Sequence, residues 1–288
     1  MRLGALEAGG TKMVCAIGNA NGEIYERISI PTETPEITVP KMIEYFKEKD
    51  IQALGIGCFG PIDLNRKSET YGYITTTPKL AWKNYNIVGA FADALDIPVG
   101  FDTDVNGSAL GEATWGITKG LDNSIYITIG TGVGMGIISN GKLLHGMLHP
   151  EGGHVLLTRH PKDTYGGKCP YHSNCLEGLA AGPAIEARWG IELADKKEVW
   201  ELEAYYIGQA LVDCIMLLSP QRIVLGGGVM HQEHMMPLVR EEVKKQLNGY
   251  LVTKELEDLD SYIVLPSLND NQGIMGALKL AVDELAMQ

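Results

Sequence analysis

The stretch that most constrains this chain is a run of glycines between two strand-like segments, Gly130 to Gly136. A β-rich run, 124–129, precedes it, and 137–139 followed by Asn140-Gly141 comes after it. Asn-Gly next to strand-like runs marks a hairpin, so the glycines belong to a hairpin rather than to the start of a helix. This placement excludes a dinucleotide-binding fingerprint, and the missing Gly-Lys-Ser/Thr excludes a P-loop. Such a turn lets phosphate oxygens approach the backbone, although a glycine turn without a ligand fits the pattern equally well.

A second constraint follows the hairpin, where cysteines and histidines gather in a short loop. Cys169, His172 and Cys175 are spaced three residues apart, and His154 lies upstream. Thiolates and imidazoles are the ligands of structural zinc sites, which are closed four-ligand sets. The pattern therefore predicts a structural zinc ion, the alternative being unrelated polar residues in a surface loop.

Composition bounds the class of protein. The chain has 288 residues, 45% hydrophobic residues and a net charge of −12. These values indicate a globular protein with a sizeable core and argue against nucleic acid as a partner. We find no apolar run long enough to span a membrane and no signal-peptide pattern at the N-terminus. Cys15, Cys58 and Cys214 lie in apolar runs, as expected of buried free thiols in the cytoplasm.

The order of expected elements is typical of two related α/β halves. In the first half we expect strands at 2–7, 13–18, 24–30, 53–59 and 98–101, a polar loop at 102–107, and helices at 38–49, 87–95 and 108–115. In the second half we expect a hairpin at 124–138, helices within 178–218, strands at 222–225 and 263–266, and helices at 236–249 and 273–285. We therefore expect an N-terminal domain, 1–115, completed by the C-terminal helix 273–288, and a second domain, 116–272, with a cleft between them.

Three glycine motifs in this order carry a resemblance to the actin-like sugar kinases. Residues 6–12 resemble their first phosphate motif, 129–136 their second and 225–229 their adenosine motif. Within that superfamily, Glu151-Gly152-Gly153-His154 and the Cys/His loop resemble the ROK family, in particular its bacterial fructokinases. The resemblance covers essentially the whole chain. It implies an actin-like, ribonuclease H-like duplicated fold of two α/β domains with an interdomain cleft.

The resemblance also implies roles for individual residues. Asp104 matches the catalytic base, whereas Asp102 is better suited to capping the following helix. Glu151, His154 and Glu177 match sugar-binding residues, with zinc organising their site through His154. Asn84, Gly60 and Pro61 are weaker sugar-pocket candidates, and Thr103 stands where the family has an asparagine. The residues expected to bind the nucleotide are Gly10, Thr11, Lys12, Gly130, Thr131, Gly132, Gly134, Gly226, Gly227 and Gly228.

Two departures from the family pattern concern the metals. Glu7 stands where the family usually has an aspartate linked to magnesium, so we expect Glu7 and Asp104 near Mg²⁺, with Glu7 contacting it directly or through water. The expected zinc ligands are His154, Cys169, His172 and Cys175, so that a histidine replaces one of the usual cysteines. Because the ATP motifs lie elsewhere in the sequence, we expect loss of zinc to damage sugar binding more than ATP binding.

The function that the resemblance implies is phosphorylation of a hexose by ATP, with D-fructose giving fructose 6-phosphate. Another hexose such as mannose or glucose is an alternative. So is a sugar-sensing regulator of the same family without catalysis, for which no DNA-binding segment is expected before residue 7. A zinc-dependent hydrolase would need an open metal position, and four candidate ligands argue against it. We expect a homodimer in the cytoplasm.

Overall fold

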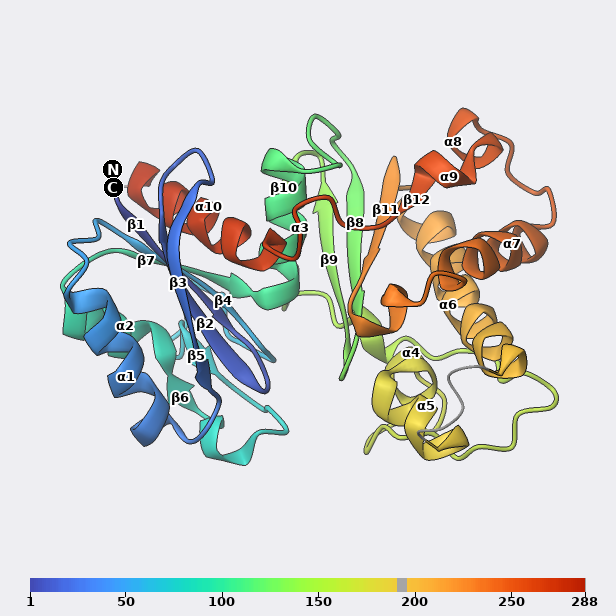
Figure 1. The fold of residues 1–288 in the computed structure, drawn as a ribbon, viewed down its shortest axis with the longest axis horizontal. Coiled ribbons are helices and arrows are strands. Elements are labelled where there is room, and N and C mark those ends of the chain that lie inside the picture. Colours follow the sequence, from blue (N-terminus) through green and yellow to red (C-terminus); the bar gives the residue numbers. More distant parts are fainter. Residues whose placement is uncertain (191–195, 288) are drawn as a thin grey trace. The chain divides into compact units, whose positions relative to one another are not determined.

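The computed structural model describes residues 1–190 and 196–287, and the chain divides into two compact units (Figure 1). Unit 1 consists of Met1–Gly120, Leu143–Pro150 and Ser267–Gln288. Unit 2 consists of Leu121–Lys142 and Glu151–Pro266. The chain therefore leaves unit 1 twice and returns to it twice.

Unit 1 is built on a mixed five-stranded sheet in the order β3-β2-β1-β4-β7. Strands β1, β2 and β3 form an antiparallel meander, and β4 and β7 extend it in parallel. All five residues of β4 and of β7 are buried, as expected for strands covered on both faces. The strands are β1 (Leu3–Ala8), β2 (Lys12–Gly18), β3 (Ile24–Pro31), β4 (Leu54–Cys58) and β7 (Val99–Thr103).

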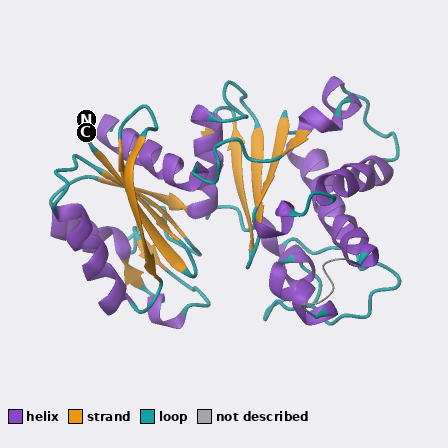
Figure 2. Ribbon diagram, viewed as in Figure 1, coloured by secondary structure: helices purple, strands orange, loops and turns teal. Residues whose placement is uncertain are grey.

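Helices cover both faces of this sheet (Figure 2). Alternation along β1 places Leu6 in one cluster with apolar residues of α1 and α2, and Leu3 in another with residues of α10. The helices of unit 1 are α1 (Pro35–Lys47), α2 (Ile87–Leu95), α3 (Asp104–Trp115) and α10 (Gln272–Ala286), and its short elements are β5 (Tyr73–Ile74), η1 (Leu80–Trp82) and β6 (Tyr85–Asn86).

Helix α3 begins earlier than the sequence pattern predicts. The expected loop 102–107 does not exist, because β7 runs to Thr103 and α3 starts at Asp104. Thr103 is the N-cap, and its Oγ1 accepts a hydrogen bond from the Asn106 N–H at 3.1 Å. The expectation that Asp102 caps the helix is therefore wrong. Close packing on α10 fixes the helix, since a Cβ on Gly276 would lie 1.7 Å from the Gly107 carbonyl oxygen.

Unit 2 repeats the sheet of unit 1, in the order β10-β9-β8-β11-β12. Strands β8 and β9 are antiparallel, and β11 and β12 extend the sheet in parallel. The strands are β8 (Ser124–Ile129), β9 (Val133–Ser139), β10 (Lys142–Leu143), β11 (Arg222–Gly226) and β12 (Ile263–Val264). Each unit thus has a glycine-containing hairpin first and parallel strands after it, which is a duplicated fold.

The remaining described elements of unit 2 are helices. The expected helical stretch 178–218 contains three described helices, α4 (Leu176–Ala180), α5 (Gly182–Trp189) and α6 (Lys197–Leu218), with 191–195 outside the described residues. The other elements are η2 (Gly152–His154), η4 (Gly228–His231), α7 (Met235–Leu247), α8 (Lys254–Glu257) and α9 (Leu259–Tyr262). Among the described helices of either unit, none has the length and apolarity that crossing a membrane requires.

Candidate functional site

Unit 2 contains a cavity at the tip of its glycine hairpin. The cavity has a volume of about 590 Å³, and the hairpin contributes Gly130 and Thr131 to it. Helix α5 supplies another wall, and η4 supplies Gly228. An open cavity that combines apolar walls with backbone of a glycine turn suits a nucleotide. The described residues around it are Gly130, Thr131, Gly182, Pro183, Ile185, Glu186, Gly190, Val199, Trp200, Gly228, Val229 and Gln232.

The three consecutive glycines at the end of β11, Gly226 to Gly228, have different surroundings. Gly228 lines the cavity, and a Cβ there would meet nothing within 4 Å. Gly227 has a φ of +89°, and a Cβ on it would lie 2.4 Å from the Ile129 carbonyl oxygen. Gly226 ends β11 and packs on the Tyr126 hydroxyl. Gly134 likewise lies within β9, paired with Thr128.

The first glycine motif forms the turn between β1 and β2 in unit 1. The Gly9 N–H donates to the Lys12 carbonyl at 3.1 Å, so that Gly10 and Thr11 occupy the tip of the hairpin. The Thr32 N–H donates to the Thr11 carbonyl at 3.0 Å and holds the turn against the end of β3. Gly10, Thr11 and Lys12 are each at least partly exposed, as a phosphate-binding turn requires.

Asp104 occupies the first turn of α3, at the carboxyl end of β7. Its Oδ1 accepts a hydrogen bond from the Val105 N–H at 2.8 Å. Burial raises the pKa of the Asp104 carboxyl, against the opposing effect of that N–H. A carboxylate with a raised pKa is a stronger base than an exposed aspartate, and the partly exposed side chain is accessible for proton transfer.

Glu7, in β1, is a second carboxylate whose pKa the charge of Asp104 affects. Burial, together with the charge of Asp104, raises the pKa of Glu7 to about 7, while Lys12 and Arg27 act in the opposite direction. The N-terminal turn of α10 also packs on this carboxylate, because a Cβ on Gly273 would lie 2.7 Å from Glu7 Cδ. Two carboxylates that repel each other in a partly buried place form a donor set that suits a hard cation such as Mg²⁺.

We expect Glu7→Gln to stabilise the metal-free protein increasingly as pH rises. The unfolded chain ionises Glu7 near its ordinary pKa of 4.5, whereas the folded chain does so only near 7, so the native state loses stability across that interval. The glutamine removes this loss, which amounts to at most about 3 kcal/mol. Thermal unfolding in EDTA at pH 5 and pH 8 measures the change, with exposed Glu69→Gln as control. A stabilisation independent of pH would contradict the raised pKa.

A polar cluster in unit 1, which sequence reasoning missed, adjoins Asp104 in the chain, and its members are buried except for the exposed His145. The Asp102 carboxylate lies 2.8 Å from His145 Nε2 and accepts from Asn106 Nδ2 at 2.6 Å. Hydrogen bonding to Asp102 raises the pKa of His145. The Ile62 N–H donates to His149 Nε2 at 3.1 Å, and burial lowers the pKa of His149. The spacing of His145 and His149, just before Glu151, is the signal that could have found them.

The weaker sugar-pocket candidates are also in unit 1. Gly60 precedes Pro61 through a cis peptide bond, and a Cβ on Gly60 would lie 3.2 Å from His149 Cε1. Asn84 has a φ of +59° and its N–H donates to the Thr75 carbonyl at 3.4 Å. The Thr103 hydroxyl oxygen is already the acceptor of the α3 cap. The structure thus gathers Gly60, Pro61 and His149, and Thr75 links Asn84 to Pro61, because the Thr75 N–H donates to the Pro61 carbonyl at 2.8 Å.

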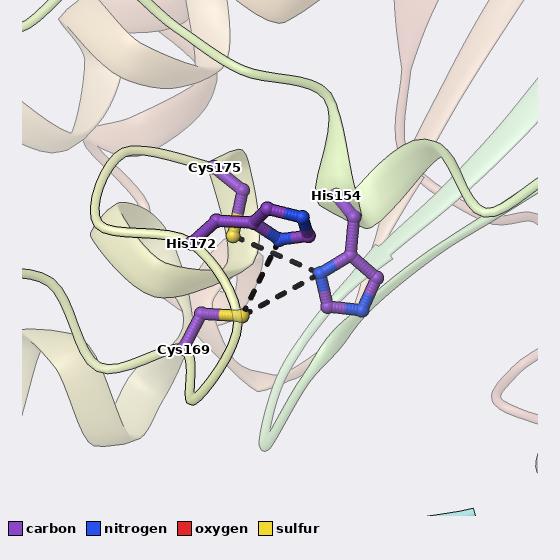
Figure 3. Close-up of side chains that lie close together, drawn as sticks. All are labelled: His154, Cys169, His172 and Cys175. Atoms are coloured by element: carbon purple, nitrogen blue, oxygen red, sulfur yellow. Dashed lines mark hydrogen bonds between the residues drawn. The ribbon is translucent and has the colours of Figure 1, made fainter. Parts of the chain in front are cut away.

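The four predicted zinc ligands come together in unit 2 (Figure 3). Their ligand atoms all lie within 4.8 Å of one another. His154 Nδ1 is 3.8 Å from Cys169 Sγ and 3.7 Å from Cys175 Sγ, and His172 Nδ1 is 3.7 Å from Cys169 Sγ. Tetrahedral zinc with ordinary bond lengths places neighbouring sulfur and nitrogen ligands about 3.6 Å apart. The residues therefore fit a four-coordinate zinc ion.

Backbone groups support both sulfurs of this cluster. The Tyr171 N–H points at Cys169 Sγ at 3.4 Å, and the Gly178 N–H at Cys175 Sγ at 3.3 Å. Such N–H donors stabilise thiolates that bind a metal. Cys175 is also the N-cap of α4, which carries Glu177, whereas Glu151 precedes η2, which carries His154. The cluster thus joins the segments of two predicted sugar-binding carboxylates.

The fold and these motifs define the class of protein. The family model described as "ROK family" matches residues 3–284, so the chain belongs to the ROK family. It is 53% identical to a putative fructokinase of Bacillus subtilis over 97% of this chain and 95% of that protein. It is 47% identical to a fructokinase of Streptococcus mutans over 96% of each chain.

A solved structure gives the same result for the fold. The ROK hexokinase of Thermus thermophilus matches all of both chains with a TM-score of 0.78 and 25% identity. Together with the duplicated sheets, this likeness confirms the predicted actin-like α/β fold. The family that the motifs indicated is confirmed as well.

Proposed function

We propose that this protein is a sugar kinase that transfers the terminal phosphoryl group of ATP to D-fructose and forms fructose 6-phosphate. The observation that carries the proposal is the near-full-length likeness to fructokinases at 53% and 47% identity. The cavity lined by Gly130, Thr131 and Gly228 supports the nucleotide part of the reaction.

Asp104 is the general base in this proposal. Phosphoryl transfer to a sugar requires a group that accepts the proton of the attacking hydroxyl, together with accurate positioning of both substrates. Asp104 supports this role because it is held at the first turn of α3, is partly exposed, and has a raised pKa. On either side of Asp104, Asp102 and Asn106 are joined to each other by a hydrogen bond. Asp102 is also held by its contact with His145.

The other proposed roles are sugar binding and nucleotide binding, and residues of both units contribute to them. In unit 2, Glu151, His154 and Glu177 bind sugar hydroxyls, with His154 using Nδ1 for the Cys/His cluster and leaving Nε2, which points away from both sulfurs (Figure 3). In unit 1, Gly60, Pro61, Asn84 and Thr103 are the further sugar-pocket candidates. The nucleotide residues are those of the three glycine motifs, namely Gly10, Thr11, Lys12, Gly130, Thr131, Gly132, Gly134, Gly226, Gly227 and Gly228.

Two metal ions accompany this function. Glu7 and Asp104 would hold Mg²⁺, which neutralises charge on the phosphates during transfer. His154, Cys169, His172 and Cys175 would hold zinc in a closed set, so that its role is to order the loop around Glu177. The buried free thiols Cys15, Cys58 and Cys214 support the cytoplasm as the compartment. Three consecutive exposed apolar residues end α6, namely Met216, Leu217 and Leu218, and this run supports a homodimer, which light scattering would test.

We expect ADP release from ATP to depend on both fructose and Mg²⁺. A coupled assay with fructose, mannose and glucose at equal concentrations measures the preference, and fructose should give the highest kcat/KM. Excess EDTA should abolish the reaction, and magnesium alone should restore it. Restoration by zinc without magnesium would show that the catalytic metal is misassigned. Sugar binding without any ADP release would instead favour the alternative function, a sugar-sensing regulator without catalysis.

A further inference from the structure

The side chain of Glu177 reaches the glycine hairpin across the fold of unit 2. The Val133 N–H, at the start of β9, donates to Glu177 Oε2 at 3.0 Å. The same oxygen would lie 2.8 Å from a Cβ on Gly132, whose backbone is not in the left-handed region. A methyl group on Gly132 would therefore displace this carboxylate, which contacts two consecutive residues of the hairpin.

This hairpin is the one that borders the nucleotide cavity. Its residues Gly130 and Thr131 line that cavity, and Gly132 and Val133 follow directly. The Gly182 N–H, at the start of α5, donates to the Gly130 carbonyl at 2.8 Å. The segment 177–182 thus holds the hairpin at both ends of its turn. Because Glu177 occupies the Val133 N–H, this donor is not offered to a phosphate oxygen.

Glu177 is itself fixed by the Cys/His loop. It lies in the first turn of α4, two residues after Cys175, and the Cys175 sulfur is the cap that accepts the Gly178 N–H. The Ala181 N–H donates to the Glu177 carbonyl at 3.1 Å and joins the end of α4 to the start of α5. The orientation of the carboxylate is therefore set by the same turn that carries a predicted zinc ligand.

We propose that Glu177 is a positioning residue for the nucleotide, which holds the phosphate hairpin in its binding conformation before any sugar enters. The proposal rests on the proposed function in one respect, that the cavity of unit 2 takes ATP or ADP. It adds to the sugar-binding role proposed for Glu177, because it requires an effect on nucleotide affinity in the absence of sugar.

The sign of the effect separates positioning from simple electrostatics. Removal of a negative charge beside a phosphate-binding hairpin would, by Coulomb's law alone, strengthen ADP binding. Loss of the hydrogen bond between Glu177 and the Val133 N–H, which orders the hairpin, would instead weaken ADP binding. A backbone hydrogen bond to a charged acceptor corresponds to about tenfold to a hundredfold in an equilibrium constant.

The test is the affinity for ADP with Mg²⁺ and without sugar, measured by titration calorimetry. Glu177→Ala should weaken ADP binding by about tenfold or more. Glu177→Gln should recover most of that affinity, because the amide oxygen accepts the Val133 N–H, while the KM for fructose stays raised. The control Glu255→Ala removes the same negative charge from an exposed position on α8 of the same unit. It should bind ADP as the wild type does.

Gly132→Ala gives a second test from the other side of the contact, outside the Cys/His loop. Its methyl group should collide with Glu177 Oε2 and weaken ADP binding, and the double variant with Glu177→Ala should be no weaker than Glu177→Ala alone. Additive losses, or unchanged ADP affinity in Glu177→Ala, would overturn the proposal while leaving the kinase function intact. Failure of the wild type to bind ADP would overturn both.

Discussion

Asp104→Asn is expected to lower kcat by about 10²–10⁴-fold while sugar and ADP still bind. The amide has nearly the same shape as the carboxylate, and its oxygen can still accept the Val105 N–H that Asp104 Oδ1 accepts at 2.8 Å. It cannot take a proton from the sugar hydroxyl. At saturating Mg²⁺ the change removes only the proton acceptor needed during transfer, so kcat and kcat/KM should fall together.

The measurement is steady-state ADP release with fructose and ATP varied in turn, beside direct binding of each substrate. Asp96→Asn is the matched control, since Asp96 is an exposed residue of unit 1 with a φ of 53°, a conformation that asparagine also tolerates. Its kinetics should equal those of the wild type. Turnover by a folded Asp104→Asn protein at the wild-type rate would exclude Asp104 as the base.

Cys175→Ser is expected to release zinc and to raise the KM for fructose strongly. The purified wild type should contain one zinc per chain, because four ligand atoms already lie within 4.8 Å of one another. A serine hydroxyl is a poor zinc ligand. Release of the zinc ion detaches the N-terminal end of α4, which carries Glu177, from His154, although a serine hydroxyl can still accept the Gly178 N–H that caps the helix.

The structure changes the effect that we expect Cys175→Ser to have on ATP binding. Sequence position alone suggests that the ATP motifs remain undisturbed, but Glu177 contacts the phosphate hairpin through Val133. We therefore expect the KM for ATP to rise as well, by about as much as Glu177→Ala weakens ADP binding, with the larger effect on fructose. Cys214→Ser, at a buried thiol away from the cluster, is the control and should retain zinc. Wild-type protein without zinc would end the assignment.

Local sequence patterns determined much of this protein. The alternation of strand-like runs with helical ones predicted most of the main helices and strands of the described residues close to their observed places, such as Ile87–Leu95. The residue types of the Cys/His loop predicted a metal cluster whose four members do meet. These features depend on neighbours in the chain or on the chemistry of single side chains, which a sequence displays directly.

The tertiary structure alone decided the contacts between distant segments. It starts α3 at Asp104 because packing on α10 and the Thr103 cap outweigh a loop-like composition. It pairs Asp102 with His145. It brings Glu177 to Val133, 44 residues away, and closes the cavity with α5. Hydrogen bonds of this kind form only after strands and helices have packed, so no local pattern of residues specifies them.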